Sequence, residues 1–213
     1  MLSGLHVPKR RRDWRLGRWT AKAAVHAFAE LSAGRVEILA ASDGAPEAWI
    51  DGAPVGVSLS LSHRADRALA VVWEAPGAIG CDLELIESRS GAFVRDWLAP
   101  AERALVAAAA PQDRDRLVNL LWSAKEAASK ARRQGLWLDL SNAVTELAGG
   151  SLGNAATRRW EPLSVSWADA PGSTAGWWRD EPGWVIAIAG EPAPAVPRDL
   201  PATSPPRTLT VGG

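Results

Sequence analysis

The chain has 213 residues, enough for one large domain or for two smaller ones that share a core. Its 24 basic residues balance its 24 acidic residues, so no overall field favours binding to nucleic acid or to a membrane surface. The single cysteine, Cys81, excludes internal disulfides and indicates a reducing compartment. No apolar run has the length of a signal-peptide core or of a membrane span, so we expect a soluble, cytoplasmic protein.

The first predicted element is a basic helix. Residues 9–22 carry seven basic side chains against one acid, Asp13, and the apolar spacing predicts a helix over about residues 14–31. A clustered positive charge in a neutral protein is a candidate anion site, and a solvated basic helix end is the alternative. Nucleic acid is disfavoured because few aromatic residues are interleaved with the basic ones.

Short strands are predicted next. Residues 38–40 and 49–50 are extended candidates around turn signals. Residues 57–62 alternate strictly, with serines predicted outward and aliphatic side chains inward, and they pair with residues 68–73 across a turn. His63 then lies at a strand end beside this turn, where a side chain can reach a cleft; a structural role is the alternative.

After a break at Pro76-Gly77, an acidic strand is predicted over residues 78–85. Its apolar face is formed by Ile79, Cys81 and Leu83. Asp82 and Glu84 point to the other face, roughly 7 Å apart. Two carboxylates this close repel each other unless they are neutralised, and Mg²⁺ is a typical partner for such a pair together with phosphate oxygens. A solvent-facing acidic edge strand is the alternative.

Three helices follow in the prediction. The first covers residues 91–98, and the second begins at Pro100 with Glu102 in its first turn, where the helix dipole favours an acid as a cap. The third covers about residues 114–133. Its apolar stripe consists of Leu117, Leu120, Leu121, Ala124, Ala128 and Ala131.

The face of the third helix opposite the stripe carries Glu126 and Lys130 one turn apart, with Trp122 one turn before them. A solvated face would seldom carry a tryptophan, so we expect this face to line a site. The chain has only four lysines, and Lys125 and Lys130 are two of them, which suggests compact charges placed at phosphates. An ordinary exposed Glu–Lys pair is the alternative.

The C-terminal part is predicted to contain three strands. They cover residues 136–147, 163–167 and 184–189, with a Gly- and Trp-rich loop near Trp177-Trp178. From Gly190 onward the chain is rich in proline and lacks periodicity, so residues 191–213 are predicted to be a disordered tail.

Four of these segments together resemble the 4'-phosphopantetheinyl transferases of the single-chain type. They are Arg10-Arg-Arg12 through Arg18, Ser60-Leu-Ser62-His63, Gly80-x-Asp82-x-Glu84 and Trp122-x-x-Lys125-Glu126-x-x-x-Lys130. The resemblance implies an α+β fold of two similar α/β halves, each a small, mainly antiparallel sheet packed with helices, related by a pseudo-two-fold axis. The halves would be residues 1–76 and 77–190. One departure is Gly52-Ala53-Pro54, where the family often has Gly-Lys-Pro, so one phosphate or carrier contact is missing or is supplied by an arginine elsewhere.

The resemblance also implies a reaction. A serine of an apo carrier, either an acyl carrier protein or a peptidyl or polyketide carrier domain, would receive phosphopantetheine from coenzyme A with release of 3',5'-ADP. A monomer would suffice, with no nucleic acid or membrane partner. Another Mg²⁺-dependent phosphotransfer enzyme or nuclease, and a catalytically inactive carrier-binding protein, are the alternatives.

The resemblance implies roles for individual residues. Mg²⁺, or Mn²⁺, would be held by Asp82 and Glu84, with Glu126 and Glu102 as further candidate ligands. Glu126 would act as ligand or as general base, and Glu102 as ligand or as helix cap. The residues expected to contact coenzyme A are Arg11, Arg12, Arg18, Ser62, His63, Lys125 and Lys130. The residues expected in catalysis are Glu126, Lys130 and His63.

Overall fold

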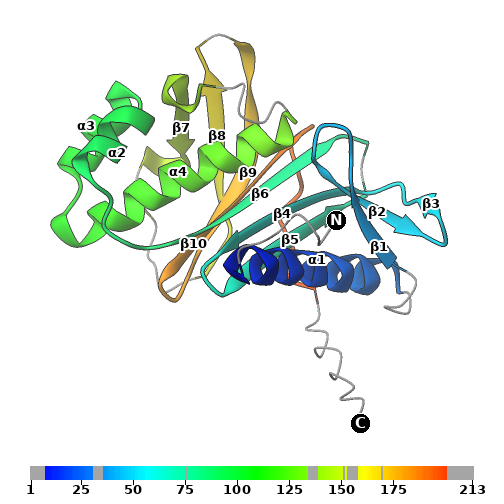
Figure 1. Ribbon diagram of the computed structural model, residues 1–213. Coiled ribbons are helices and arrows are strands. Elements are labelled where there is room, and N and C mark those ends of the chain that lie inside the picture. Colours follow the sequence, from blue (N-terminus) through cyan, green and yellow to red (C-terminus); the bar gives the residue numbers. More distant parts are fainter. Residues whose placement is uncertain are drawn as a thin grey trace.

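The structure is a computed structural model that describes residues 8–30, 36–74, 76–133, 139–150, 152, 158–168 and 170–200. Its N-terminal half contains helix α1 (Pro8–Ala29) and two small antiparallel sheets. One sheet is formed by β1 (Val36–Ala40), β2 (Pro46–Ile50) and β3 (Ala53–Pro54), and the other is the hairpin of β4 (Ser58–Arg64) and β5 (Arg67–Trp73). Helix α1 lies along the hairpin and buries Ala21 and Val25 against these strands (Figure 1).

The C-terminal half is built on a five-stranded antiparallel sheet with the order β6-β10-β9-β8-β7. Its strands are β6 (Ala78–Leu85), β7 (Ala143–Leu147), β8 (Glu161–Trp167), β9 (Ala170–Glu181) and β10 (Trp184–Glu191). Helix α4 (Arg114–Ala131) crosses one face of this sheet, with α2 (Gly91–Trp97) and α3 (Pro100–Ala108) beside it (Figure 1). Single 3₁₀ turns lie at Pro111–Asp113, Leu140–Asn142 and Ala148–Gly150.

The two halves meet where β4 lies beside β6, the edge strand of the larger sheet. An edge strand has unpaired backbone groups, and here two serine hydroxyls of β4 satisfy them. The N–H of Cys81 donates to Ser60 Oγ at 2.9 Å, and the N–H of Leu83 donates to Ser62 Oγ at 3.3 Å. Both serines are buried, so the prediction that they face outward is wrong. Alternation alone does not say which face of a strand another sheet will cover.

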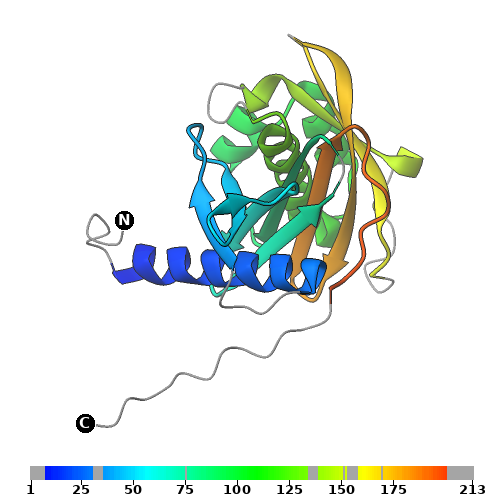
Figure 2. The same ribbon diagram turned by 90° about the vertical axis from the view of Figure 1, so that its right-hand side faces the viewer.

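The predicted fold class is confirmed, because the chain folds as an α+β protein with two halves of antiparallel sheet packed with helices. Seen from the side, α1 lies below the strands and α4 lies on the far side of them (Figure 2). Every residue of the predicted apolar stripe of α4 is buried. Within the described residues, no helix is long and apolar enough to cross a membrane.

Four predicted boundaries were wrong. Helix α1 begins at Pro8 rather than near residue 14. In the described part of the predicted strand at 136–147, Leu140–Asn142 form a 3₁₀ turn and Ala143–Leu147 form the strand; residues 134–138 lie outside the described part. The predicted loop at Trp177-Trp178 belongs to β9, because both tryptophans pair with neighbours in β8 and β10.

The fourth correction concerns the start of the predicted disordered tail. Strand β10 continues to Glu191, and residues 192–200 then follow a defined path. The indole N–H of Trp177 donates to the carbonyl of Pro194 at 2.9 Å, and Arg179 pairs with Asp199 at 2.8 Å. These contacts hold this segment against β9, whereas residues 201–213 lie outside the described part of the chain.

Candidate active site

The site depends on the close approach of helix α4 to strand β6, and Gly80 makes this approach possible. A β-carbon at Gly80 would lie 1.9 Å from the carbonyl oxygen of Ala127 and 2.5 Å from the nitrogen of Ala131. Any larger residue would therefore push the helix backbone off the strand. Asp82 and Glu84 share this face of β6, so the contact brings the acidic strand under the last turns of α4.

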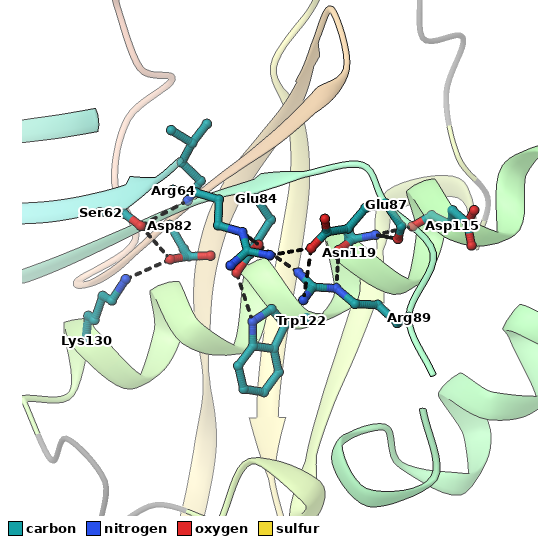
Figure 3. Close-up of polar contacts among 11 residues, drawn as sticks. Ser62, Arg64, Asp82, Glu84, Glu87, Arg89, Asp115, Asn119, Trp122 and Lys130 are labelled. Atoms are coloured by element: carbon teal, nitrogen blue, oxygen red, sulfur yellow. Dashed lines mark hydrogen bonds and ion pairs between the residues drawn. The ribbon is translucent and has the colours of Figure 1, made fainter. Parts of the chain in front are cut away.

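Asp82 is the most enclosed acid of the site, with 4% of its surface exposed. Its Oδ1 accepts hydrogen bonds from Ser62 Oγ at 2.7 Å and from Lys130 Nζ at 2.8 Å (Figure 3). Lys130 also donates to the carbonyl of Cys81 at 3.0 Å, which fixes its ammonium group on the strand. The second oxygen, Oδ2, is buried without a partner among the described residues. Such an oxygen is costly unless a ligand occupies the site.

Glu84 lies two residues further along β6 in a separate polar network (Figure 3). Its Oε1 accepts from the indole N–H of Trp122 at 3.2 Å, and its Oε2 is 2.8 Å from Nη2 of Arg89 and 3.5 Å from Nε of Arg64. Asn119 accepts from Nε of Arg89 at 2.7 Å and so holds that arginine in place. Burial raises the pKa of Glu84, and the charge of Asp82 raises it further.

Trp122 is positioned by two other aromatic side chains. The rings of Phe93 and Trp97 each lie 5.2 Å from its ring, centroid to centroid, in edge-on arrangements. This packing of α2 against α4 directs the indole N–H at Glu84. Trp122 therefore faces the acidic strand and does not lie on a solvated face of the helix.

Glu126 and Lys130 titrate under the influence of the same acids. Burial raises the pKa of Glu126, and Asp82 and then Glu84 raise it further, while Lys130 acts in the opposite direction. Burial by itself lowers the pKa of Lys130, but the charge of Asp82 and its hydrogen bond outweigh this effect and raise it overall. Lys130 is therefore a fixed cation at neutral pH, and Glu126 is a carboxyl group with increased affinity for a proton.

A cavity of about 360 Å³ opens beside Lys130. Its walls come from the turn between β1 and β2, from β4, from the start of β6 and from the C-terminal end of α4. Lys130 belongs to this wall and also contacts Asp82, so it connects the cavity with the acidic strand.

Comparisons with known proteins agree with this arrangement. A sequence model of the 4'-phosphopantetheinyl transferase superfamily matches residues 78–188, more than half of the chain. The chain belongs to this superfamily. A second model, of the 4'-phosphopantetheinyl transferase N-terminal domain, matches residues 5–73. A search of curated proteins finds no match.

Among solved structures, the chain is similar to the holo-[acyl-carrier-protein] synthase of Thermotoga maritima, with 15% sequence identity and a TM-score of 0.42. The match covers 53% of this chain and 61% of that protein, so it spans less than two thirds of the length of the relative.

Lys125 and Glu102 form a buried ion pair, which makes the expected contact of Lys125 with coenzyme A wrong and decides between the two roles given for Glu102. Lys125 Nζ lies 2.6 Å from Glu102 Oε2, and the two side chains are 0% and 1% exposed. Glu102 also accepts the backbone N–H groups of Ala99 and Thr145, both at 2.8 Å. Glu102 is thus the helix cap of α3 rather than a metal ligand, and Lys125 reaches neither a phosphate nor a carrier surface.

Of the other predicted site residues of this superfamily member, one lies within the site and four lie elsewhere on the N-terminal half. Ser62 lies within the site, where it donates to Asp82. His63 is exposed, and strand alternation directs it to the face of β4 opposite Ser62. Arg11 and Arg12 are exposed on α1, whereas Arg18 donates to the carbonyl of Ile38 in β1. Their contacts with coenzyme A remain predictions.

Sequence reasoning missed the arginines that neutralise Glu84. Arg89 follows β6 in an irregular segment and Arg64 ends β4, so neither belongs to a periodic pattern that would mark it. The position of Asn119 in the site could have been predicted from its spacing along the helix. Asn119 precedes Trp122 by three residues and Glu126 by seven, a spacing that places all three on one face of the helix.

The donor set of the site fits a small divalent cation. Asp82 offers a buried oxygen that has no partner among the described residues, and the charge of Glu84 contributes to the raised pKa of Glu126. In the described chain no three His, Cys, Asp or Glu side chains form a complete metal site. A cation bound here would therefore take most of its ligands from phosphate oxygens and water, as Mg²⁺ does.

Proposed function

We propose that this protein transfers the 4'-phosphopantetheine group of coenzyme A to a serine of an apo carrier protein, either an acyl carrier protein or a peptidyl or polyketide carrier domain. The observation that carries this proposal is the buried Oδ2 of Asp82, which has no partner among the described residues, while Oδ1 of the same carboxylate binds Lys130 of the cavity wall. The superfamily supports phosphopantetheinyl transfer in general. Dependence on Mg²⁺ and the type of carrier are part of the proposal.

In this reaction the serine oxygen of the carrier forms a bond to the β-phosphorus of coenzyme A. The bond from that phosphorus to the oxygen of 3',5'-ADP breaks, and the serine proton must be accepted by a base. Glu126 is suited to accept it, because its raised pKa increases its affinity for a proton above that of an ordinary carboxylate. Lys130 stays charged and holds a phosphate oxygen at the end of the cavity.

Asp82 and Glu84 would hold the divalent cation, which would neutralise the charge that develops on the pyrophosphate oxygens. Service of Glu126 as a third ligand is the alternative to its role as the base. The charges of Arg89 and Arg64 oppose the rise in the pKa of Glu84, and their contacts orient its carboxylate. Ser62 and Lys130 both donate to Oδ1 of Asp82 and so orient the carboxylate. Its other oxygen, Oδ2, has no partner among the described residues.

The test is intact-mass spectrometry of a panel of apo carrier proteins incubated with this protein, coenzyme A and Mg²⁺. We expect one carrier to gain the mass of a phosphopantetheine group, and we expect chelator or Asp82→Asn to abolish the gain. Arg95→Ala is a matched control, because Arg95 is exposed and its guanidinium pairs with the neighbouring Asp96 on α2. If no carrier in the panel is modified and coenzyme A does not bind, the proposed function is wrong.

A further inference from the structure

Arg133 has a backbone conformation that normally selects glycine. Helix α4 ends at Ala131, and two residues later Arg133 has a φ of 53°, in the left-handed region. A side chain in this region is unfavourable, and helices usually end there with glycine. The conformation separates two adjacent arginines. Arg132 lies over the ring of Trp167 and 3.5 Å from Glu191, whereas Arg133 is directed to the other half of the molecule.

The partner of Arg133 is Asp43, in the turn between β1 and β2. Two parallel hydrogen bonds join them, from Nε to Oδ2 at 2.8 Å and from Nη2 to Oδ1 at 3.0 Å. The hydrogen bond from Arg133 lowers the pKa of Asp43. The side chains are 47% and 35% exposed, and a pair in contact with water contributes little to stability. The guanidinium is therefore oriented in advance and is released at low cost.

Arg133 and Asp43 both line the cavity that opens beside Lys130. Among the described residues of its wall, Lys130 and Arg133 are the cations. Arg11, Arg12 and Arg18, which were expected to contact coenzyme A, are absent from this wall. Pro54 belongs to the cavity wall. The cavity therefore borders the tripeptide Gly52-Ala53-Pro54, in which the superfamily often has a lysine in place of Ala53.

The two cations stand in different surroundings. Lys130 is bound to Asp82 at the acidic strand, where the pyrophosphate would react. Arg133 follows it by three residues, beyond the last turn of the helix, and is not bound to the acids of the reacting site. A ligand that spans the cavity would thus carry its reacting phosphate at Lys130 and a second phosphate at Arg133. The guanidinium fork that now holds a carboxylate matches the geometry of a phosphate ester equally well.

We propose that Arg133 binds the 3'-phosphate of coenzyme A, and that Asp43 holds its guanidinium in the cavity until this phosphate replaces the carboxylate. The inference rests on the proposed function and adds to it the residue that distinguishes coenzyme A from 3'-dephospho-coenzyme A. Asp43 and the phosphate compete for the same donors, so removal of the Asp43 charge strengthens binding instead of weakening it.

The test is isothermal titration calorimetry with coenzyme A and with 3'-dephospho-coenzyme A, on full-length wild type and three variants. We expect Arg133→Ala to weaken binding of coenzyme A about tenfold or more and to leave binding of the dephospho compound unchanged. Asp43→Asn should tighten binding of coenzyme A by up to about fivefold. Arg95→Ala should change neither affinity, and thermal denaturation of each variant checks that the fold is intact.

Three results would overturn the inference. Equal weakening of both ligands by Arg133→Ala would show a general effect on the cavity and not a contact with the 3'-phosphate. Unchanged affinities in Arg133→Ala would show that Arg133 is only a structural link to Asp43, while coenzyme A binding by the wild type would leave the proposed function standing. Absence of coenzyme A binding by the wild type would remove the proposed function and this inference together.

Discussion

Substitution of Lys125 distinguishes a structural lysine from a substrate contact. In Lys125→Met, the carboxylate of Glu102 would remain in the core with two backbone N–H donors but no cation. The carbonyls of Trp97 and Leu140, which accept from Lys125 at 2.9 and 3.1 Å, would lose their donor as well. Because the pair is almost fully buried, we expect a loss of about 3–5 kcal/mol in the free energy of unfolding. This is a large share of the roughly 5–15 kcal/mol that stabilises a typical domain.

The double variant Glu102→Gln/Lys125→Met tests whether the loss of stability comes from the unpaired charge of Glu102. It removes both charges, so we expect it to recover most of the lost stability in urea denaturation, and to bind coenzyme A like the wild type. The single variant should bind coenzyme A normally at temperatures where it is still folded. A single variant as stable as the wild type would show that the pair is not buried in solution. A stable double variant that has lost coenzyme A binding would show that Lys125 is a substrate contact after all.

Two further predictions concern the acidic strand. Gly80→Ala should push α4 away from β6 and destabilise the fold by about 1–3 kcal/mol, and it should weaken coenzyme A binding because Lys130 leaves Asp82; unchanged urea denaturation would contradict the close contact. In metal-free protein, Glu126→Gln should raise the melting temperature near neutral pH but not near the unfolded pKa of about 4.3. The folded pKa of Glu126 is raised, so its contribution to stability is present at acidic pH and is lost as pH rises through that pKa. The same difference at both pH values in calorimetry would refute this.

Short-range patterns in the sequence predicted the elements that carry the site. The period of α4 identified its buried stripe and placed Trp122, Glu126 and Lys130 on the other face, and the alternation of β6 placed Asp82 beside Glu84. Both patterns are periodic, and periodicity follows directly from the geometry of a helix or a strand. Membership of the superfamily was also predicted from the residues of α4 and β6, because two of its motifs lie on these elements.

The roles of the two lysines were decided by packing. Lys125 follows the buried Leu121 by four residues and lies at the border of the apolar stripe. Its ammonium group has an acidic partner in the core because α3 packs beside α4 and places Glu102 there. Lys130 is one turn further along and meets Asp82, because Gly80 lets the helix approach the strand. The helical period places Lys125 at the border of the stripe and Lys130 opposite it, but it does not identify the partner of either lysine.

The sequence by itself determined the helices, most of the strands, the superfamily and the acids on β6, whereas it missed strand β9. The tertiary structure alone decided that Ser60 and Ser62 join the halves, that Arg89 and Arg64 neutralise Glu84, and that Arg133 meets Asp43. Arg133 and Asp43 are 90 residues apart in the chain. Contacts of this kind form between elements whose relative positions are set by the packing of the whole core, and no periodic pattern encodes them.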